Sequence, residues 1–158
     1  MSKTVPPRPI VIDGKRTFII VASQFNARYV EGLVDHAKQE LHVLAPNAAV
    51  SVQRVPGAFE IPVVVGELAS KGMANALIAC GVILKGKTDH AQNLSRSVSD
   101  ALQRVAIGHG VPVINAVLSF DNETQARDRC LGSEINRGTE AARAAVEIAD
   151  VMSKLRGK

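Results

Sequence analysis

The sequence predicts an α/β sandwich in which helices cover both faces of a doubly wound parallel sheet. Short apolar runs alternate with amphipathic segments from one end of the chain to the other. Residues 76–84 (ALIACGVIL) are apolar without interruption, which is typical of a central parallel strand covered by helices on both sides. The alternation and this fully apolar strand together favour three layers, α, β and α.

The first half of the chain contains two predicted strands, each followed by a predicted helix. Residues 17–22 (TFIIVA) form a β-branched run, and apolar residues then recur at helical spacing over 29–41. The alternating segment 50–53 (VSVQ) predicts a strand with one solvent-facing side. A helix is expected to open at 60–62 and to run to about Ser70, because its first turn tolerates Pro62.

The second half repeats this order. After the apolar strand, helical spacing of apolar residues over 94–105 predicts a helix, and 113–118 (VINAVL) predicts the fourth strand. Asn122 and Gln125 fit a capping box that starts a short helix to about Cys130. An alanine-rich helix closes the chain, with apolar positions at Ala142, Val146, Ala149 and Met152.

The length of 158 residues favours one domain. We expect residues 16–158 to form this α/β domain, since no linker or internal repeat interrupts them. Residues 1–15 are predicted to be an extended N-terminal arm, because Pro6, Pro7 and Pro9 disfavour a helix.

Composition and charge exclude several classes of protein. Hydrophobic residues make up 46% of the chain and charged residues 22%, which excludes intrinsic disorder. No apolar run approaches the ~18–20 residues of a bilayer span, and no signal peptide is recognised. We therefore expect a cytoplasmic protein with no membrane partner. The scattered net charge of +4 and an aromatic content of 3% disfavour nucleic acid and favour anionic small molecules.

The two cysteines give no sign of a metal site or a disulfide. Cys80 and Cys130 lie far apart in the sequence, without a CxxC motif or a neighbouring histidine pair. We expect neither feature here.

Four segments that follow the predicted strands are expected to meet at one edge of the sheet. Ligands of open parallel sheets bind outside the carboxyl ends of the strands. The segments 23–26, 56–60, 85–90 and 119–122 would bring aromatic rings, a carboxylate, an amide, a basic turn and a histidine to that edge. This set predicts a pocket for a flat heterocycle beside an anion.

Residues 81–88 (GVILKGKT) match the P-loop pattern GxxxxGK[ST]. A P-loop leaves its strand at the first glycine, whereas here the apolar run continues through Val82, Ile83 and Leu84, so Gly81 is expected to lie inside the strand. A nucleotide hydrolase is therefore kept only as an alternative. Residues 86–88 are also expected to open a helix whose free N–H groups and lysine favour phosphate, or else to form a plain turn.

Several side chains at this edge are candidates for binding or catalysis. His90 would lie in a first helical turn as a proton shuttle. Phe25 and Phe59 either stack on a ligand or belong to the core. Glu60 either interacts with its helix dipole or also accepts hydrogen bonds from a ligand.

Three polar residues further along the chain have two interpretations each. Asn115 interrupts an apolar strand, so it is either satisfied by a neighbour or faces a subunit interface. Arg129 and Arg137 are either solvated helix charges or bidentate partners of a phosphate.

Five motifs occur in order along the chain: Phe25-Asn26, 55–62 (VPGAFEIP), 86–90 (GKTDH), the QAxxR pattern ending at Arg129, and 136–138 (NRG). In these motifs the chain resembles the lumazine synthase family, the penultimate enzymes of riboflavin biosynthesis. The segment 55–62 is the most specific of them, and the match runs in order from about residue 16 to 155.

This resemblance implies a flavodoxin-like four-stranded parallel sheet of order 2-1-3-4 and a transferase activity. The family condenses 5-amino-6-(D-ribitylamino)uracil with 3,4-dihydroxy-2-butanone 4-phosphate to 6,7-dimethyl-8-ribityllumazine, releasing phosphate and water without cofactor or metal. A lumazine- or flavin-binding shell protein without catalysis is a further alternative.

The resemblance also implies a role for each matching residue. Phe25 and Phe59 would flank the pyrimidine, and His90 would transfer protons. Lys87 and Thr88 would bind the phosphate, which Arg129 of the adjacent subunit would also reach. The substrate-binding set is completed by Asn26, Ala58, Glu60, Val82, Ile83, Leu84, Asn115 and Arg137.

The family forms homopentamers with active sites between adjacent subunits, and some pentamers close into icosahedral shells. In this chain Asn115 stands where many members have Phe, and Arg137 stands where Lys is usual, which changes the donor geometry. Residues 130–135 differ from the linker of shell-forming members. The prolines of the arm limit any added strand to 10–12.

Overall fold

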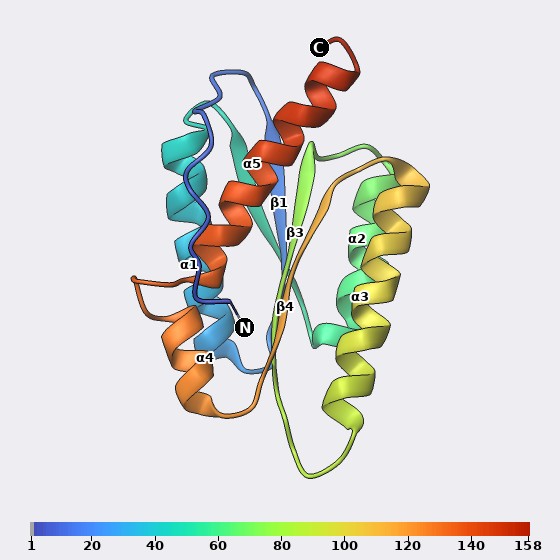
Figure 1. Ribbon diagram of the computed structural model, residues 1–158. Coiled ribbons are helices and arrows are strands. Elements are labelled where there is room, and N and C mark those ends of the chain that lie inside the picture. Colours follow the sequence, from blue (N-terminus) through green and yellow to red (C-terminus); the bar gives the residue numbers. More distant parts are fainter. Residues whose placement is uncertain (1) are drawn as a thin grey trace.

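The computed structural model describes residues 2–158 as a four-stranded parallel sheet between two layers of helices (Figure 1). The sheet order is β2-β1-β3-β4, as the family resemblance implied. The strands are β1 (Thr17–Ser23), β2 (Ala49–Val55), β3 (Ala76–Leu84) and β4 (Val113–Phe120).

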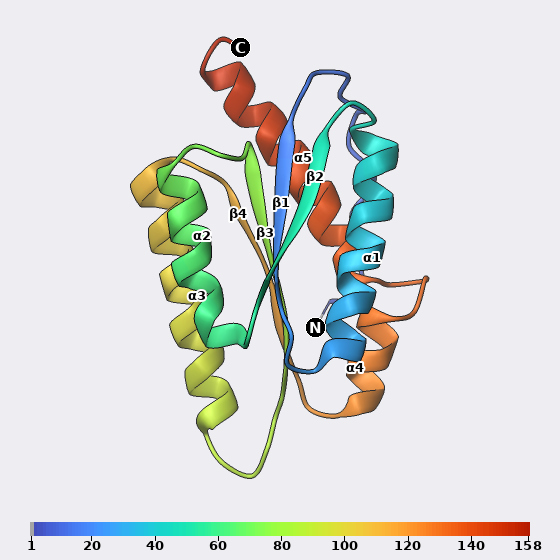
Figure 2. The ribbon, with the colours of Figure 1, turned by 180° about the vertical axis from the view of Figure 1, so that it is seen from behind.

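The helices are divided between the two faces of the sheet (Figures 1 and 2). One face is covered by α1 (Ala27–Leu44), α4 (Glu123–Cys130) and α5 (Arg137–Leu155). The other face is covered by α2 (Ile61–Ser70) and α3 (His90–His109), with the short 3₁₀ turn η1 (Ala58–Glu60) before α2. The three-layer prediction is therefore confirmed. No helix among residues 2–158 is long and apolar enough to span a membrane.

Strand β3 is the centre of the sheet and separates two hydrophobic cores. It pairs with β1 on one side and β4 on the other, and its first eight residues are buried. Ile78 and Cys80 face the core under α1, α4 and α5, while Leu77 and Ala79 face the core under α2 and α3. By contrast, β2 lies at an edge and alternates exposed with partly buried residues, as its sequence predicted.

Two helix starts differ in detail from the prediction. Helix α3 begins at His90 rather than at residues 86–88, which form a loop instead. At α4, Asn122 Oδ1 accepts a hydrogen bond from the Gln125 N–H at 2.9 Å, as a capping box requires. The Gln125 side chain, however, accepts from the N–H of Asp121, one residue before the cap.

The N-terminal arm has no helix or strand among residues 2–16 and follows the surface of α1 and α5 (Figure 1). The N–H of Ile12 donates to the Leu44 carbonyl at 2.8 Å, and Asn47 Nδ2 donates to the Asp13 carbonyl at 2.8 Å. The arm is therefore bound to its own domain by backbone groups at its carboxyl end.

A buried carboxylate holds the middle of the arm. Glu40 of α1 is only 5% exposed and forms ion pairs with Arg8 of the arm, at 2.9 Å, and with Arg143 of α5. Arg143 Nη1 also donates to the Pro6 carbonyl at 2.6 Å. Burial acts to raise the pKa of Glu40, but the hydrogen bonds from Arg8 and Arg143 outweigh burial and lower it.

We predict that Glu40→Gln destabilises the protein in a pH-dependent manner. Because the folded-state pKa of Glu40 is lowered, its contribution is present above the unfolded value of 4.5 and is lost as the pH falls through the folded value. At pH 7 the variant should lose roughly 2 kcal/mol of unfolding free energy.

Thermal unfolding at fixed protomer concentration, from pH 7 down to pH 3, measures this effect. The matched control is Glu31→Gln, because Glu31 pairs with Arg54 at an exposed site where such pairs contribute little. Equal Tm values for the Glu40 variant and the wild type at pH 7 would contradict the prediction.

Candidate functional site

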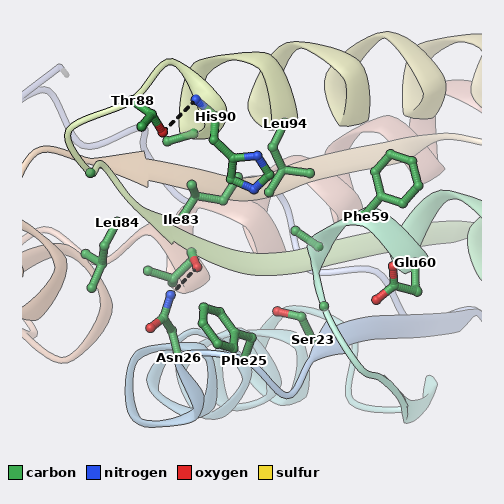
Figure 3. Close-up of a pocket in the computed structure, with 15 residues that line it drawn as sticks. Ser23, Phe25, Asn26, Phe59, Glu60, Ile83, Leu84, Thr88, His90 and Leu94 are labelled. Atoms are coloured by element: carbon green, nitrogen blue, oxygen red, sulfur yellow. Dashed lines mark hydrogen bonds between the residues drawn. The ribbon is translucent and has the colours of Figure 1, made fainter.

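A pocket of about 590 Å³ opens at the carboxyl ends of β1 and β3, beside η1 and the first turns of α3. This is the edge of the sheet at which a parallel arrangement is expected to bind its ligand. Figure 3 shows the side chains that surround it. The lining residues are Ser23, Phe25, Asn26, Gly57, Ala58, Phe59, Glu60, Val82, Ile83, Leu84, Gly86, Thr88, His90, Ala91 and Leu94.

Most of the predicted site residues lie in this pocket. The structure brings together Phe25, Asn26, Ala58, Phe59, Glu60, Val82, Ile83, Leu84, Thr88 and His90. Four predicted residues do not line it: Lys87, Asn115, Arg129 and Arg137. Ser23, Gly57 and Gly86 lie in the segments predicted to meet at this edge but were not singled out, whereas Ala91 and Leu94 lie outside those segments. Leu94 lies one helical turn after His90, so the helical repeat could have identified it.

The two phenylalanines are surface residues of this pocket rather than core residues. Phe25 is 72% exposed and Phe59 is 67% exposed. Phe25 lies just before α1 and Phe59 lies in η1, and both rings border the pocket in Figure 3. The N–H of Phe25 donates to the Pro56 carbonyl at 3.1 Å, which ties the two ring-bearing segments together. Large exposed apolar rings at a concave site favour contact with a flat ligand.

Asn26 forms the junction between β1 and α1. Its φ of 57° lies in the left-handed region, and it is the one non-glycine residue with positive φ among residues 2–158. Its side-chain Nδ2 donates to the Val82 carbonyl of β3 at 2.7 Å. Such a backbone conformation persists only where the surroundings hold it. Asn26 therefore connects the two strand ends on which the pocket is built.

His90 and Glu60 supply the titratable groups of the pocket. His90 is the first residue of α3, and Figure 3 shows its ring directed into the pocket. Its backbone N–H lies 3.4 Å from Thr88 Oγ, while the ring itself stays free of protein hydrogen bonds in the described chain. Glu60 ends η1 and precedes α2, and its N–H donates to the Gly57 carbonyl at 3.2 Å. A proton-transfer group and a hydrogen-bond acceptor thus face the same space.

A second, polar cavity of about 270 Å³ holds Arg129. It is formed where β4 meets α4, and its other lining residues are Lys85, Ser119, Phe120, Asp121 and Gln125. Lys85 Nζ lies 2.8 Å from Asp121 Oδ1, and this hydrogen bond lowers the pKa of Asp121. Arg129 is thus near the same edge of the sheet as the pocket but in a separate cavity.

Asn115 and Arg137 have protein partners away from the pocket. Asn115 is exposed on β4, where its Nδ2 donates to Ser99 Oγ and its Oδ1 accepts from the N–H of Val117, each at 3.0 Å. Arg137 begins α5 and binds both carboxylate oxygens of Glu140 at 2.7 and 2.8 Å. Neither residue therefore contributes to this pocket from its own chain.

The P-loop interpretation is not favoured by the backbone. Gly81 is paired with Val117 inside the β3–β4 ladder, and the strand continues to Leu84. The free N–H groups that would wrap a phosphate are therefore absent at Gly81.

The cysteines are buried thiols. Burial raises the pKa of both Cys80 and Cys130 to about 12, which keeps them protonated and unreactive. Among residues 2–158 no group of three or more His, Cys, Asp or Glu side chains is arranged to hold a metal ion.

Comparison with known proteins gives a consistent result over nearly the whole chain. The family model described as 6,7-dimethyl-8-ribityllumazine synthase matches residues 15–153. A protein of that name from Xanthomonas campestris pv. campestris is 39% identical over 142 residues, covering 87% of this chain and 90% of the relative. Another from Xylella fastidiosa is 40% identical over 139 residues, with the same coverage. The chain therefore belongs to the 6,7-dimethyl-8-ribityllumazine synthase family.

Proposed function

We propose that this protein makes 6,7-dimethyl-8-ribityllumazine in riboflavin biosynthesis. The substrates are 5-amino-6-(D-ribitylamino)uracil and 3,4-dihydroxy-2-butanone 4-phosphate, and the other products are phosphate and water. The proposal rests on the pocket of this family member. Exposed Phe25 and Phe59 border this pocket, and the imidazole of His90 lines it.

The pocket matches the pyrimidine substrate in shape and polarity. The two phenylalanine rings and the apolar residues 82–84 offer surfaces on which a flat ring packs. Glu60 offers a carboxylate to the N–H groups of the ring or to the hydroxyls of the ribityl chain. A mostly apolar pocket with a few polar groups is the usual form of a small-molecule site.

The reaction needs positioned substrates and proton transfer rather than a protein nucleophile. The 5-amino group attacks the ketone, and loss of a first water gives a Schiff base. Removal of a proton from the adjacent carbon expels the phosphate from the terminal carbon, and tautomerisation restores a carbonyl. The ribityl-bearing nitrogen then attacks this carbonyl, and loss of a second water closes the ring. His90 is the side chain that moves these protons.

The phosphate of the second substrate is assigned to the loop between β3 and α3. Thr88 lines the pocket from this loop, and the exposed Lys87 lies next to it. The first turn of α3 directs its free N–H groups and the positive end of the helix dipole toward the same end of the pocket. These groups would stabilise the phosphate as it leaves.

The same proposal includes a homopentamer whose active sites lie between adjacent subunits. Arg129 has a role in the family pattern but lies in a separate cavity of its own chain. It would therefore reach the phosphate bound by the neighbouring subunit. Asn115, exposed on the edge strand β4, would likewise face the neighbour's pocket.

We predict that His90→Ala slows turnover by roughly 10- to 100-fold without loss of assembly, because proton transfer is lost while the surface of α3 is kept. Product fluorescence and phosphate release measure the rate against an uncatalysed control. His109→Ala, at the exposed end of the same helix, is the matched control and should retain full activity. Full activity of the His90 variant would refute the assignment.

Nucleotide binding distinguishes the P-loop alternative. We predict no Mg²⁺-dependent ATP or GTP binding by the wild-type protein, since Gly81 lies inside the β3–β4 ladder. Equilibrium dialysis measures it. Binding that Lys87→Ala abolishes would support the hydrolase instead, whereas tight riboflavin binding without turnover would support the shell-protein alternative.

Co-expression of two impaired variants tests whether the site is shared between subunits. His90→Ala and Arg129→Ala each damage a different part of the composite site. In randomly mixed pentamers each site takes His90 from one subunit and Arg129 from its neighbour. Both residues are therefore intact in about a quarter of the sites. We therefore expect activity to return to about a quarter of the wild-type value. Activity that stays at the level of the separate variants would place both residues in one subunit's site.

A further inference from the structure

The last residue of β1 breaks the apolar pattern of its face of the sheet. Ile19 and Val21 point into the core beneath α2 and α3, and the alternation of a strand places Ser23 on the same side. The pattern therefore predicts an apolar side chain at this position. A hydroxyl stands there instead, and Ser23 is 2% exposed.

The Ser23 hydroxyl has no protein partner. The backbone on either side is fixed, because Ser23 is in register with Val55 and the N–H of Gln24 donates to the Val55 carbonyl at 2.8 Å. The side-chain hydrogen bonds of residues 2–158, such as that from Asn26 to Val82, do not include Ser23 Oγ. The Oγ atom is not among the fully buried unpartnered atoms of residues 2–158, because Ser23 lines the pocket, so the hydroxyl is accessible to a ligand there.

The Ser23 hydroxyl packs closely against Gly81 of β3, where any larger residue would crowd it. A Cβ atom at Gly81 would lie 3.3 Å from Ser23 Oγ and 3.3 Å from Val117 Cγ1. Ser23 lines the pocket, and Figure 3 shows it between Phe25 and Glu60. The unpartnered hydroxyl therefore belongs to the wall that a ligand between the phenylalanines would contact.

We propose that Ser23 is a specificity-determining residue that hydrogen-bonds the ribitylamino-pyrimidine. This inference rests on the proposed function. A hydroxyl both donates and accepts, so it pairs with a carbonyl or N–H of the ring edge or with a hydroxyl of the ribityl chain. A site that holds a buried polar group for its ligand also discriminates against analogues that lack the matching group.

The binding role and a structural role make opposite predictions for Ser23→Ala. If the hydroxyl serves the ligand, its removal weakens binding but leaves the Tm unchanged, since no hydrogen bond within the protein is lost. If the hydroxyl serves the fold, the Tm falls and the affinity stays the same. The small change in volume limits any effect on packing.

The experiment compares the wild type, Ser23→Ala and the control Ser51→Ala on the exposed face of β2. The probe is 5-nitro-6-(D-ribitylamino)uracil, which lacks the reacting amine, and calorimetry gives its Kd. We expect Ser23→Ala to weaken binding about 3- to 10-fold. The KM for the pyrimidine should rise similarly while the KM for the butanone phosphate stays unchanged, and the control should match the wild type.

A second probe, 6-amino-5-nitrouracil, identifies the partner. Weakening of both probes assigns the hydroxyl to the ring edge, and weakening of the ribityl probe alone assigns it to the chain. An unchanged Kd for the ribityl probe in Ser23→Ala overturns the inference while leaving the proposed function intact. Failure of the wild type both to bind this probe and to turn over the substrates overturns the proposed function, and the inference with it.

Discussion

The pairing of β3 with parallel strands on both sides is the constraint on which the rest of the structure depends. Because β1 and β4 run in the same direction as β3, their carboxyl ends come to one edge of the sheet. Each parallel connection needs a helix that crosses a face, so both faces of β3 become buried. The segments that follow the strands must then carry the polar and aromatic groups of the pocket.

Several residues at the pocket edge have conformations or exposures that lower the stability of the folded chain. Phe25 and Phe59 keep most of their surface in water, Asn26 holds a left-handed backbone, and Ser23 puts a polar group in an apolar strand face. The two cores beneath the helices supply the apolar burial that offsets these costs. Glu40 joins the arm, α1 and α5 through Arg8 and Arg143, and none of these three residues lines the pocket.

One chain presents an incomplete set of the groups that the family pattern assigns to catalysis. The pocket contains His90, Glu60 and Thr88, whereas Arg129 lies in a cavity of its own beside the end of β4. The proposed site between subunits would reconcile these positions, because β4 is an edge strand and α4 follows it directly. Catalysis would then require assembly, since an isolated subunit would lack the guanidinium that binds the phosphate.

The fold class and the edge of the sheet that holds the pocket followed from the sequence, because periodicity reports which residues are buried and strand ends in parallel sheets converge. The family resemblance added individual pocket residues such as Ala58 and Ile83. The sequence could not determine that α3 begins at His90 rather than at residues 86–88, since turn geometry depends on neighbouring loops. The position of Gly81 inside β3 was predicted from the apolar run and is confirmed by the β3–β4 ladder. The separation of Arg129 from the pocket and the close packing of Ser23 against Gly81 became visible only in three dimensions. Both features depend on contacts between residues that are far apart in the sequence, and a local sequence pattern contains no information about such contacts.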